Sequence, residues 1–469
     1  MKVIIVGGVA GGATAAARIR RLNEHAEITV FERSGYISYA NCGLPYYIGD
    51  VITDPEELTL QTPESFFKRF RINMKIHHEV ISIHPERKTV SVKNLENGEI
   101  FEEKYDKLIL SPGAKPTQPR LPGVGIDKLF TLRTVEDTFR IKEYINKNHP
   151  KSAVLAGGGF IGLELGIKES IVVNDRMETS VPDIYAAGDA VQVKHYVTGN
   201  DALISLAGPA NKQGRIIADN ICGGDSRYLG SQGSSVIKVF DMTAATTGIN
   251  ETNAKKSGLE VDTVILSPMS HAGYYPGGKV MTMKVVFEKE TYRLLGAQII
   301  GYEGVDKRID VLATAIHAGL KATQLKDLDL AYAPPYSSAK DPVNMAGFMI
   351  DNIAKGTLKQ WHLEDMDKIS KDKDVVLLDV RTVGEFNRGH MDGFKNIPVD
   401  ELRERINEIE KGKPVYLICQ SGLRSYIASR ILEGNGYETY NFSGGFRFYD
   451  AVINDRALIE RAYACGMDY

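Results

Sequence analysis

The sequence has few cysteines, and their placement excludes two kinds of site. Cys42, Cys222, Cys419 and Cys465 are far apart in 469 residues, and none belongs to a CxxC pair. We therefore expect neither a zinc centre nor a disulfide framework, and no other metal site. Isolated thiols are typical of a reducing compartment, so we expect a cytoplasmic protein in which a functional cysteine acts through its reactivity.

The sequence also lacks a strong charge imbalance and long apolar runs. The net charge is −3, with 25% charged and 43% hydrophobic residues, which gives no electrostatic basis for binding nucleic acid or an acidic membrane. No stretch approaches the roughly 20 apolar residues of a membrane span. The opening MKVIIVGGVAGG is too short for a signal peptide and breaks into glycines. We expect neither nucleic acid nor membrane as a partner.

The order of patterns predicts about three domains. The apolar residues 2–6 precede a glycine-rich turn, a helical segment and the strand EITVFER, an order typical of a dinucleotide-binding βαβ unit. From about Ser234, longer apolar/polar alternation predicts a mostly antiparallel sheet, with a helix at DKRIDVLATAIHAGL. A new unit starts near Trp361, with strands VVLLDVR and PVYLICQ.

The first turn, Gly7-Gly8-Val9-Ala10-Gly11-Gly12, matches a GxGxxG fingerprint except that Val9 replaces the middle glycine. Such turns let backbone N–H groups at a helix N-terminus face a pyrophosphate. Glu32 ends the second strand, where an acid binds a ribose. A tight turn without a ligand is the plain alternative, but Glu32 and the later Gly188-Asp189 favour a nucleotide site.

Seven segments together carry a resemblance to a known family: GGVAGGATAAARIRRL, SYANCGLPYYIGD, YDKLILSPGAKP, GGGFIGLE, TSVPDIYAAGDA, SHAGYYPGG and AYAPPYSSAKDPVNM. The chain resembles the pyridine nucleotide-disulfide oxidoreductases, and within them the coenzyme A-disulfide reductases and NADH-dependent persulfide reductases with a fused rhodanese domain. The resemblance implies an α/β protein with a Rossmann-like FAD-binding domain, an α+β dimerisation domain and a C-terminal α/β rhodanese domain. The expected boundaries are 1–150 and 167–230 for the FAD-binding domain, 151–166 for a remnant of an NAD(P)H-binding domain, 231–355 for the dimerisation domain and 356–469 for the rhodanese domain.

The same resemblance assigns residues to FAD. The residues expected to bind it are Gly7, Gly8, Ala10, Gly11, Gly12, Glu32, Arg33, Val80, Ser111, Gly113, Phe160, Gly188 and Asp189.

Cys42 is the expected redox residue. Followed by Gly-Leu-Pro, it cannot form the CxxxxC internal disulfide of glutathione-reductase relatives. The resemblance implies that Cys42 cycles between a thiolate and a mixed disulfide with coenzyme A, or a persulfide, beside the flavin. The attacking form is the thiolate, so Ser38 and Asn41 are expected to contribute a polar pocket. A lone cysteine is usually an inert buried residue, which is how we interpret Cys222 and Cys465.

Further residues match substrate contacts of the family. Thr14, Arg18 and Arg21 are expected to hold coenzyme A, the arginines through its phosphates; a solvated helix face is the alternative. Asn211 and Lys340 fall at substrate-contacting positions. Tyr274 and Tyr332 resemble the pair that reaches the redox cysteine of the partner subunit, although Tyr275 or Tyr336 is equally placed by the motif and two core tyrosines are the alternative. This implies a homodimer with its interface near 234–350.

A second fingerprint, Gly157 to Gly162, fits GxGxxG fully, and in the family Phe160 stacks over the flavin with Glu164 nearby. The match then breaks off, because IVVNDRMETSVPDIYAAGDA of the FAD-binding domain follows almost at once. A nicotinamide-binding half needs roughly 100 residues, which makes NAD(P)H binding doubtful. A natural or engineered deletion, a segment missing from this sequence and another electron donor all remain open.

The C-terminal segment LICQSGLRSYIASRIL predicts a strand, a loop and a helix with Cys419 opening the loop. The amides from Gln420 to Arg424 are expected to surround its sulfur, Arg424 to add positive charge and Ser425 to cap the helix. The segment resembles the single-domain rhodanese loop. In LLDVRTVGEFNRGHMDGFKNIP, the other rhodanese hallmark, Asp379 and Arg381 are expected to anchor the loop. A dual-specificity phosphatase loop and a purely structural domain are the alternatives.

The expected function is that of a homodimeric flavoprotein that reduces coenzyme A disulfide, coenzyme A persulfide or a polysulfide. Cys42 attacks the substrate sulfur, FADH2 provides the electrons, and Cys419 carries sulfane sulfur, with Tyr274, Tyr332 and Arg424 completing the catalytic set. The rival interpretation is a sulfurtransferase whose FAD body serves as a coenzyme A-binding and dimerisation scaffold. A shortened chain without activity of its own is a third possibility.

Overall fold

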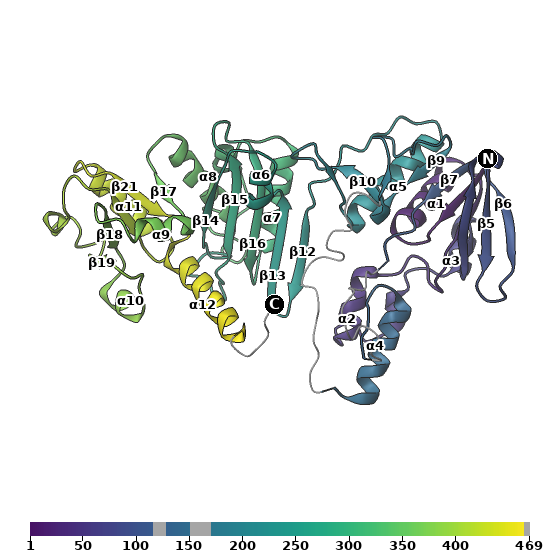
Figure 1. The fold of residues 1–469 in the computed structure, drawn as a ribbon, viewed down its shortest axis with the longest axis horizontal. Helices are drawn as coiled ribbons and strands as arrows, with labels where there is room; N and C mark the ends of the chain where they lie inside the picture. The colour runs from purple at the N-terminus through teal and green to yellow at the C-terminus, as the bar shows by residue number, and fades with distance from the viewer. Residues whose placement is uncertain (116–127, 151–169, 464–469) are drawn as a thin grey trace. The chain divides into compact units, whose positions relative to one another are not determined.

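The computed structural model describes residues 1–115, 128–150 and 170–463, and these form two compact units, Met1–Ser231 and Gln232–Tyr469 (Figure 1). The second fingerprint with Phe160 and Glu164 lies outside the described residues, as does Cys465.

The first unit is built around a parallel sheet with the order β3-β2-β1-β7-β9. Its strands are β1 (Lys2–Val6), β2 (Glu27–Phe31), β3 (Asn73–Lys75), β7 (Lys107–Leu110) and β9 (Ile184–Ala186). β1 is central, and Val3, Ile4 and Ile5 are fully buried, as expected for a strand covered on both faces. The chain order reverses between β1 and β7, so the carboxyl ends of these strands border the crevice in which open α/β sheets bind ligands.

Helices α1 (Ala10–Leu22) and α5 (Ala207–Ile221) pack closely against each other beside this sheet. Glycine allows the close approach: a Cβ on Gly214 of α5 would lie 2.4 Å from the Gly11 carbonyl oxygen of α1. Ala15 and Ala16 of α1 are fully buried. The small residues of the first helix therefore serve helix packing as well as the turn before it.

The remaining elements of the first unit surround this core. An antiparallel sheet contains β4 (His78–His84), β5 (Thr89–Asn94) and β6 (Ile100–Lys104); a small sheet contains β8 (Ile171–Val172), β10 (Val191–Lys194) and β11 (Asp201–Ala202); the helices are α2 (Leu44–Ile48), α3 (Pro63–Phe70) and α4 (Val135–Asn148). Strand β8 is short because Asn174 begins a turn closed by a hydrogen bond from its N–H to the Glu178 carbonyl.

The second unit begins with an antiparallel sheet of order β12-β13-β16-β15-β14. Its elements are β12 (Ser235–Val239), β13 (Met242–Gly248), β14 (Val261–Leu266), β15 (Thr282–Glu288), β16 (Leu294–Gly301), α6 (Glu251–Lys256), α7 (Val305–His317) and α8 (Pro342–Ala354). Helix α7 packs on β13 and β16, and α8 lies against β14. The predicted alternation and the predicted helix are both found here.

A second, parallel sheet of order β17-β21-β20-β18-β19 completes this unit. Its elements are β17 (Gln360–Trp361), β18 (Val376–Asp379), β19 (Lys395–Asn396), β20 (Val415–Ile418), β21 (Thr439–Phe442), α9 (Met366–Ile369), α10 (Val383–Arg388), α11 (Leu423–Glu433) and α12 (Gly445–Tyr463). The edge strand β14 is tied to it, since the Ile265 N–H donates to Ser443 Oγ (3.1 Å) and Gln360 Nε2 donates to the Thr263 carbonyl (2.7 Å). The predicted α/β class with an α+β middle domain is confirmed.

Replacing Gly214 with alanine tests the packing of α1 on α5. Because the new Cβ would overlap the Gly11 carbonyl, we expect Gly214→Ala to destabilise the first unit by about 1–3 kcal/mol, as overpacking does. Hydrogen exchange of the α1 and β1 peptides measures this locally. The control is Gly384→Ala on α10, where a Cβ meets nothing within 4 Å and helix propensity predicts no loss of protection. Unchanged protection in Gly214→Ala would contradict the close approach.

Candidate functional site

The glycine turn lies at the carboxyl end of β1, and its backbone is packed too closely for side chains. Gly7 has φ +95°, and a Cβ there would lie 2.0 Å from the Ser111 carbonyl oxygen that follows β7. A Cβ on Gly12 would lie 1.9 Å from the Gly7 carbonyl oxygen. The predicted residues Gly7, Gly12 and Ser111 are thus brought together. Gly8 lies in the same turn, and Ala10 and Gly11 begin helix α1.

Glu32 follows β2 and points its carboxylate at this turn. Its Oε2 accepts the Gly8 N–H at 2.8 Å and its Oε1 accepts the Ser34 N–H at 2.9 Å. Arg33 is exposed beside Glu79, and Val80 is half-buried in β4. Glu32 therefore lies where the sequence predicted, held by backbone donors.

The predicted FAD-binding residues Gly113, Gly188 and Asp189 lie in the segments that follow β7 and β9. Asp189 pairs with Arg133 Nη2 at 2.7 Å, and a Cβ on Gly113 would lie 3.2 Å from that same nitrogen. The Gly188 N–H donates to the buried Gln213 Oε1 at 2.8 Å. Sequence reasoning missed Arg133 and Gln213, because nothing local links them to positions more than 20 residues away.

The Cys42 segment starts from the same turn. The Ser38 N–H donates to the Gly8 carbonyl at 2.9 Å, and Asn41–Gly43 form a short 3₁₀ helix that carries an exposed Cys42. Leu44, which follows, is buried against Leu58. A fixed backbone thus presents an accessible thiol, whereas Cys222 is half-buried and burial raises the pKa of its thiol.

The residues expected to bind coenzyme A on α1 and α5 differ in whether another side chain already holds them. Thr14 Oγ donates to Asn211 Oδ1 at 2.5 Å, which brings two predicted residues together at the surface. Arg18 is held by Asp219, with 2.7 Å between Nε and Oδ1, whereas Arg21 is exposed. Between them in the chain lies Arg20, which is buried and donates to the backbone carbonyls of residues 70 and 71.

In the second unit the two predicted tyrosines meet. The hydroxyls of Tyr274 and Tyr332 are 2.7 Å apart, and this hydrogen bond raises the pKa of the Tyr332 hydroxyl. Both side chains are exposed, so the alternative of two core tyrosines is wrong. Lys340 is exposed further along the same loop, and its carbonyl accepts the Ser338 hydroxyl.

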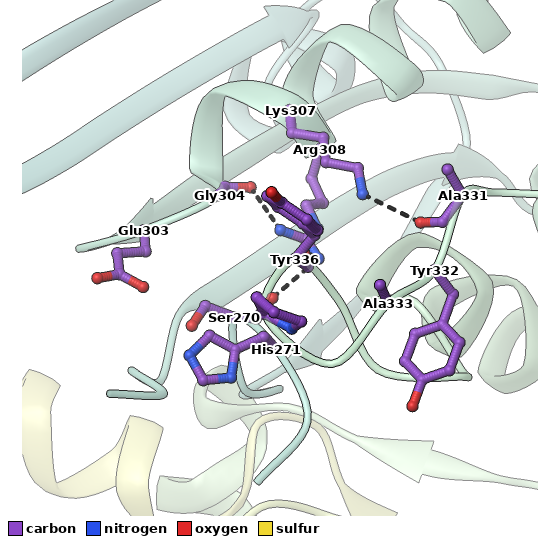
Figure 2. A pocket seen from close by; sticks show the side chains of 11 residues that line it. Ser270, His271, Glu303, Gly304, Lys307, Arg308, Ala331, Tyr332, Ala333 and Tyr336 are labelled. Carbon is purple, nitrogen blue, oxygen red and sulfur yellow. Dashed lines mark hydrogen bonds between the residues drawn. The ribbon is translucent and has the colours of Figure 1, made fainter. Parts of the chain in front are cut away.

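Tyr332 also lines a pocket of about 600 Å³ (Figure 2). The other lining residues are Ser270, His271, Glu303, Gly304, Lys307, Arg308, Ala331, Ala333, Pro335 and Tyr336. The buried Arg308 joins its walls: Nη2 donates to the Ser270 carbonyl (2.9 Å) and pairs with Asp341 (3.0 Å). The Arg308 charge is thus compensated, and Lys307 is the cation that the pocket presents.

In the C-terminal sheet, Cys419 follows β20 and begins the predicted loop. Its Sγ accepts the Gly422 N–H at 3.1 Å and the Ser425 hydroxyl at 3.2 Å. Gly422, with φ +100°, is the residue that precedes helix α11, and no side chain caps that helix. The expectation that Ser425 caps the helix is wrong: it is the third helical residue, and its hydroxyl points back to the sulfur.

The charge of Arg424 is compensated by a residue that sequence reasoning missed. Arg424 forms a two-pronged ion pair with Glu385 of α10, with both N–O distances 2.7 Å. The Arg424 guanidinium lowers the pKa of the Glu385 carboxyl to about 2; burial opposes this shift and hydrogen bonds from Thr382 reinforce it. Glu385 lies in the segment LLDVRTVGEFNRGHMDGFKNIP that marks the rhodanese resemblance. Its partner Arg424 is 39 residues away, so no local pattern indicates the ion pair.

Asp379 and Arg381 form the expected anchor beneath the loop. Arg381 Nη2 lies 2.7 Å from Asp379 Oδ2 and donates to the Gly389 carbonyl, and both residues are buried. The guanidinium also stacks 3.8 Å from the ring centroid of Phe446, whose N–H donates to the Cys419 carbonyl.

Among the described residues, no group of three or more histidine, cysteine or acidic side chains is placed to hold a metal ion. No helix in the described ranges has the length and apolar character needed to cross a membrane.

Comparisons with known proteins agree with this architecture. The family described as pyridine nucleotide-disulphide oxidoreductase matches residues 1–169, its dimerisation domain matches 234–342, and the rhodanese-like domain matches 362–451. A coenzyme A disulfide reductase of Staphylococcus aureus is 33% identical over 438 residues, covering 74% of this chain and 99% of the relative. The reduced CoADR-RHD of Bacillus anthracis has a TM-score of 0.94 and 41% identity, covering 97% and 98% of the two chains. An NAD-dependent persulfide reductase from A. fulgidus has a TM-score of 0.88 and 32% identity, covering 96% and 100%.

The matched families define the class: a flavoprotein oxidoreductase joined to a rhodanese-like domain. The chain belongs to the pyridine nucleotide-disulphide oxidoreductase family, as an FAD-dependent enzyme with a C-terminal rhodanese domain. The residues present fit FAD, because a Cβ at Gly7 or Gly12 would disrupt the turn beside which the backbone amides and Glu32 lie.

Removing the Glu385 charge tests the Arg424 pair. A carboxyl whose pKa is lowered from about 4.3 in the unfolded chain stabilises the fold above that value and loses this effect as the pH falls toward 2. We expect Glu385→Gln to destabilise the rhodanese domain by about 1–3 kcal/mol at neutral pH, with the difference from the unsubstituted protein narrowing below about pH 4.3.

Pulse proteolysis at a series of pH values measures this difference. The control is Glu408→Gln: that carboxyl also has a pKa lowered to about 2, by hydrogen bonds from Arg405 and Lys395, but it is exposed and we expect almost no effect. A Glu385→Gln loss that is independent of pH would contradict the electrostatic origin.

Proposed function

We propose that the chain reduces coenzyme A disulfide, coenzyme A persulfide or a related polysulfide through Cys42, and that Cys419 carries sulfane sulfur. The observation that carries this proposal is the exposed single thiol of Cys42, fixed by Ser38 to the nucleotide-binding turn. The relatives named as coenzyme A disulfide reductase and persulfide reductase support the substrate class.

The proposed chemistry at Cys42 is a thiol–disulfide exchange. Its thiolate attacks one sulfur of coenzyme A disulfide, a new S–S bond to Cys42 forms, and one coenzyme A thiolate leaves. Returning the mixed disulfide to two thiols requires two electrons and protons. The turn at Gly7 and the Glu32 carboxylate would hold FAD, which would supply this electron pair when bound. Ser38 and Asn41 supply polar surroundings for the thiolate.

We assign coenzyme A binding to the surface of α1 and α5. Thr14 and Asn211 present polar atoms side by side, and Arg21 is free to meet a phosphate. Arg18 keeps its charge beside Asp219 and takes a secondary part. Lys340 belongs to the other unit and is assigned to the same substrate through the family match.

We propose a homodimer in which the tyrosine pair of one subunit reaches Cys42 of the other. The match to the dimerisation domain at 234–342 supports this arrangement. We assign the Tyr332 hydroxyl, which is hydrogen-bonded to Tyr274, to protonate a departing thiolate. A cytoplasmic location fits the free thiols of Cys42, Cys222 and Cys419.

We propose the domain limits 1–150 and 167–230 for FAD binding, 231–355 for dimerisation and 356–469 for the rhodanese domain, with 151–166 a remnant of the nicotinamide half. The alignment with the Staphylococcus aureus relative supports the remnant: 74% of 469 residues is about 347, about 91 fewer than the 438 aligned positions. The same difference favours a second candidate function, a rhodanese-type sulfurtransferase on an FAD- and coenzyme A-binding dimer.

Single-turnover reduction separates these functions without relying on a nicotinamide. The FAD-loaded protein is first reduced anaerobically with dithionite, and the excess dithionite is removed. We expect the reduced protein to release two coenzyme A thiols per disulfide, while the visible absorbance of the flavin returns. Cys42→Ser should abolish this release, because the attacking thiolate is removed, and Cys419→Ser should leave it unchanged. Equal activity in Cys42→Ser would refute the proposed role.

A parallel titration with NADH shows whether a nicotinamide is a competent donor: rapid bleaching of the flavin band supports the reductase, and bleaching with dithionite alone supports the sulfurtransferase.

The tyrosine assignment can be tested in the same assay. We expect Tyr332→Phe to slow coenzyme A release by about 10- to 100-fold, because the proton donor is lost. Tyr336→Phe is the matched control, since Tyr336 lines the same pocket and is also exposed but does not bond Tyr274. If Tyr336→Phe were the slower variant, the assignment would move to the second tyrosine of the motif.

A further inference from the structure

The sulfur of Cys419 and one carbonyl compete for a single hydrogen. Ser425 Oγ lies 3.2 Å from Cys419 Sγ and 3.1 Å from the Gly422 carbonyl oxygen, and it is geometrically placed to donate to either. A hydroxyl has one hydrogen, so it serves one acceptor at full strength at a time. Ser425 is fully buried, so water does not reach its hydroxyl to replace the hydrogen bond that is not made.

A second donor serves the carbonyl when the hydroxyl turns away. Asn441, on β21, donates from Nδ2 to the Gly422 carbonyl at 3.1 Å. Asn441 is buried, and its Oδ1 has no hydrogen-bond partner among the described residues. An unpaired buried amide oxygen is unfavourable, so the favourable contact of this amide is the one that its nitrogen makes with the Gly422 carbonyl.

We propose that Ser425 is a positioning residue of the sulfur-transfer site: its hydrogen turns from the Gly422 carbonyl to the Cys419 sulfur when that sulfur becomes an anion, while Asn441 keeps the carbonyl paired. In the thiol state, the S–H hydrogen of Cys419 points to Ser425 Oγ and the hydroxyl stays on the carbonyl. Ionisation releases the thiol proton to solvent, and the hydroxyl then donates to the thiolate alongside the Gly422 N–H.

This inference deepens the proposed sulfur-carrying role of Cys419 and rests on it. In that role the thiolate attacks the outer sulfur of a persulfide R–S–SH, a bond from Cys419 Sγ to that sulfur forms, the bond from R–S to it breaks, and R–S⁻ leaves. The step transfers sulfane sulfur without net oxidation. It requires the thiolate, so the donors to Sγ set how much of the cysteine is reactive at neutral pH.

The charged groups around the sulfur do not supply this response. Arg424 on the loop is paired with Glu385 of α10, and Asp379 is paired with Arg381 at the end of β18. From α12, the exposed Arg447 contributes its backbone N–H to the Gln420 carbonyl. All of these groups are retained in the variants below, so a change in the titration of Cys419 reports on the hydroxyl.

The experiment is the pH dependence of Cys419 alkylation by iodoacetamide in the full-length, FAD-loaded protein, resolved by peptide mass spectrometry. We expect Ser425→Ala to raise the pKa of Cys419 by about one unit, which lowers its alkylation rate near neutral pH about tenfold. The rates of the two proteins should converge above both pKa values, because access to the sulfur is unchanged. The Cys42 and Cys222 peptides serve as internal standards and should keep their profiles.

The matched control is Ser429→Ala, one turn further along α11. Ser429 is also buried, but its hydroxyl donates to the Tyr426 carbonyl and not to the sulfur, so we expect the Cys419 profile to stay unchanged. Equal shifts in the two serine variants, or a rate difference that persists at high pH, would overturn the proposal, because each would indicate loosened packing.

The role of Asn441 is tested by combining variants. In Asn441→Ala, Ser425 is the side chain left to pair the Gly422 carbonyl, so its hydroxyl is less available to the sulfur. We therefore expect the pKa of Cys419 to rise, by less than in Ser425→Ala. In the Ser425→Ala background, Asn441→Ala should add no further shift. Additive shifts would overturn the part assigned to Asn441. Because alkylation needs no sulfur donor, these results stand apart from sulfur transfer to cyanide, whose absence would refute the proposed function of Cys419 alone.

Discussion

The first unit depends on one close approach of backbone to backbone. The Gly7 turn lies against the Ser111 carbonyl at the end of β7, and Gly12 lies against the Gly7 carbonyl. This contact brings the carboxyl ends of β1 and β7 together at the point where the sheet order reverses. Glu32 then reaches the Gly8 amide, and Ser38 starts the cysteine segment from the Gly8 carbonyl. The edge at which we propose that FAD binds and the position of the Cys42 thiol therefore share one structural cause.

The two cysteines that we propose to be functional differ in their exposure. Cys42 is exposed on a short 3₁₀ helix, while Cys419 is buried and receives donors from its own loop and helix. An exposed thiol suits a bulky disulfide substrate, because the thiolate must reach one substrate sulfur in line with the S–S bond that breaks. A buried sulfur suits a carrier that protects a single transferred atom from solvent. The contrast is consistent with a division between reduction and sulfur transport.

Sequence reasoning succeeded where the signal is local and failed where the partner is distant. The strand–turn–helix at Gly7, the antiparallel alternation after Ser234 and the loop at Cys419 are each encoded within about 20 residues. Arg133, Gln213 and Glu385 were missed, because each acts on a residue 25 or more positions away. Ser425 was assigned as a cap from its residue type, yet Gly422, in the αL conformation, precedes a helix that begins at Leu423, two residues before Ser425.

The pairing of charges around Cys419 determines how its anion is stabilised. Arg424 with Glu385 and Arg381 with Asp379 leave little net charge near the sulfur. Stabilisation therefore falls to oriented dipoles, namely the Gly422 N–H, the Ser425 hydroxyl and the N-terminus of α11. A fixed charge keeps its place in every state of the site, whereas a hydroxyl that rotates directs its hydrogen to the sulfur when the sulfur carries charge. A carrier that alternates between thiol, thiolate and persulfide gains from a donor of the second kind.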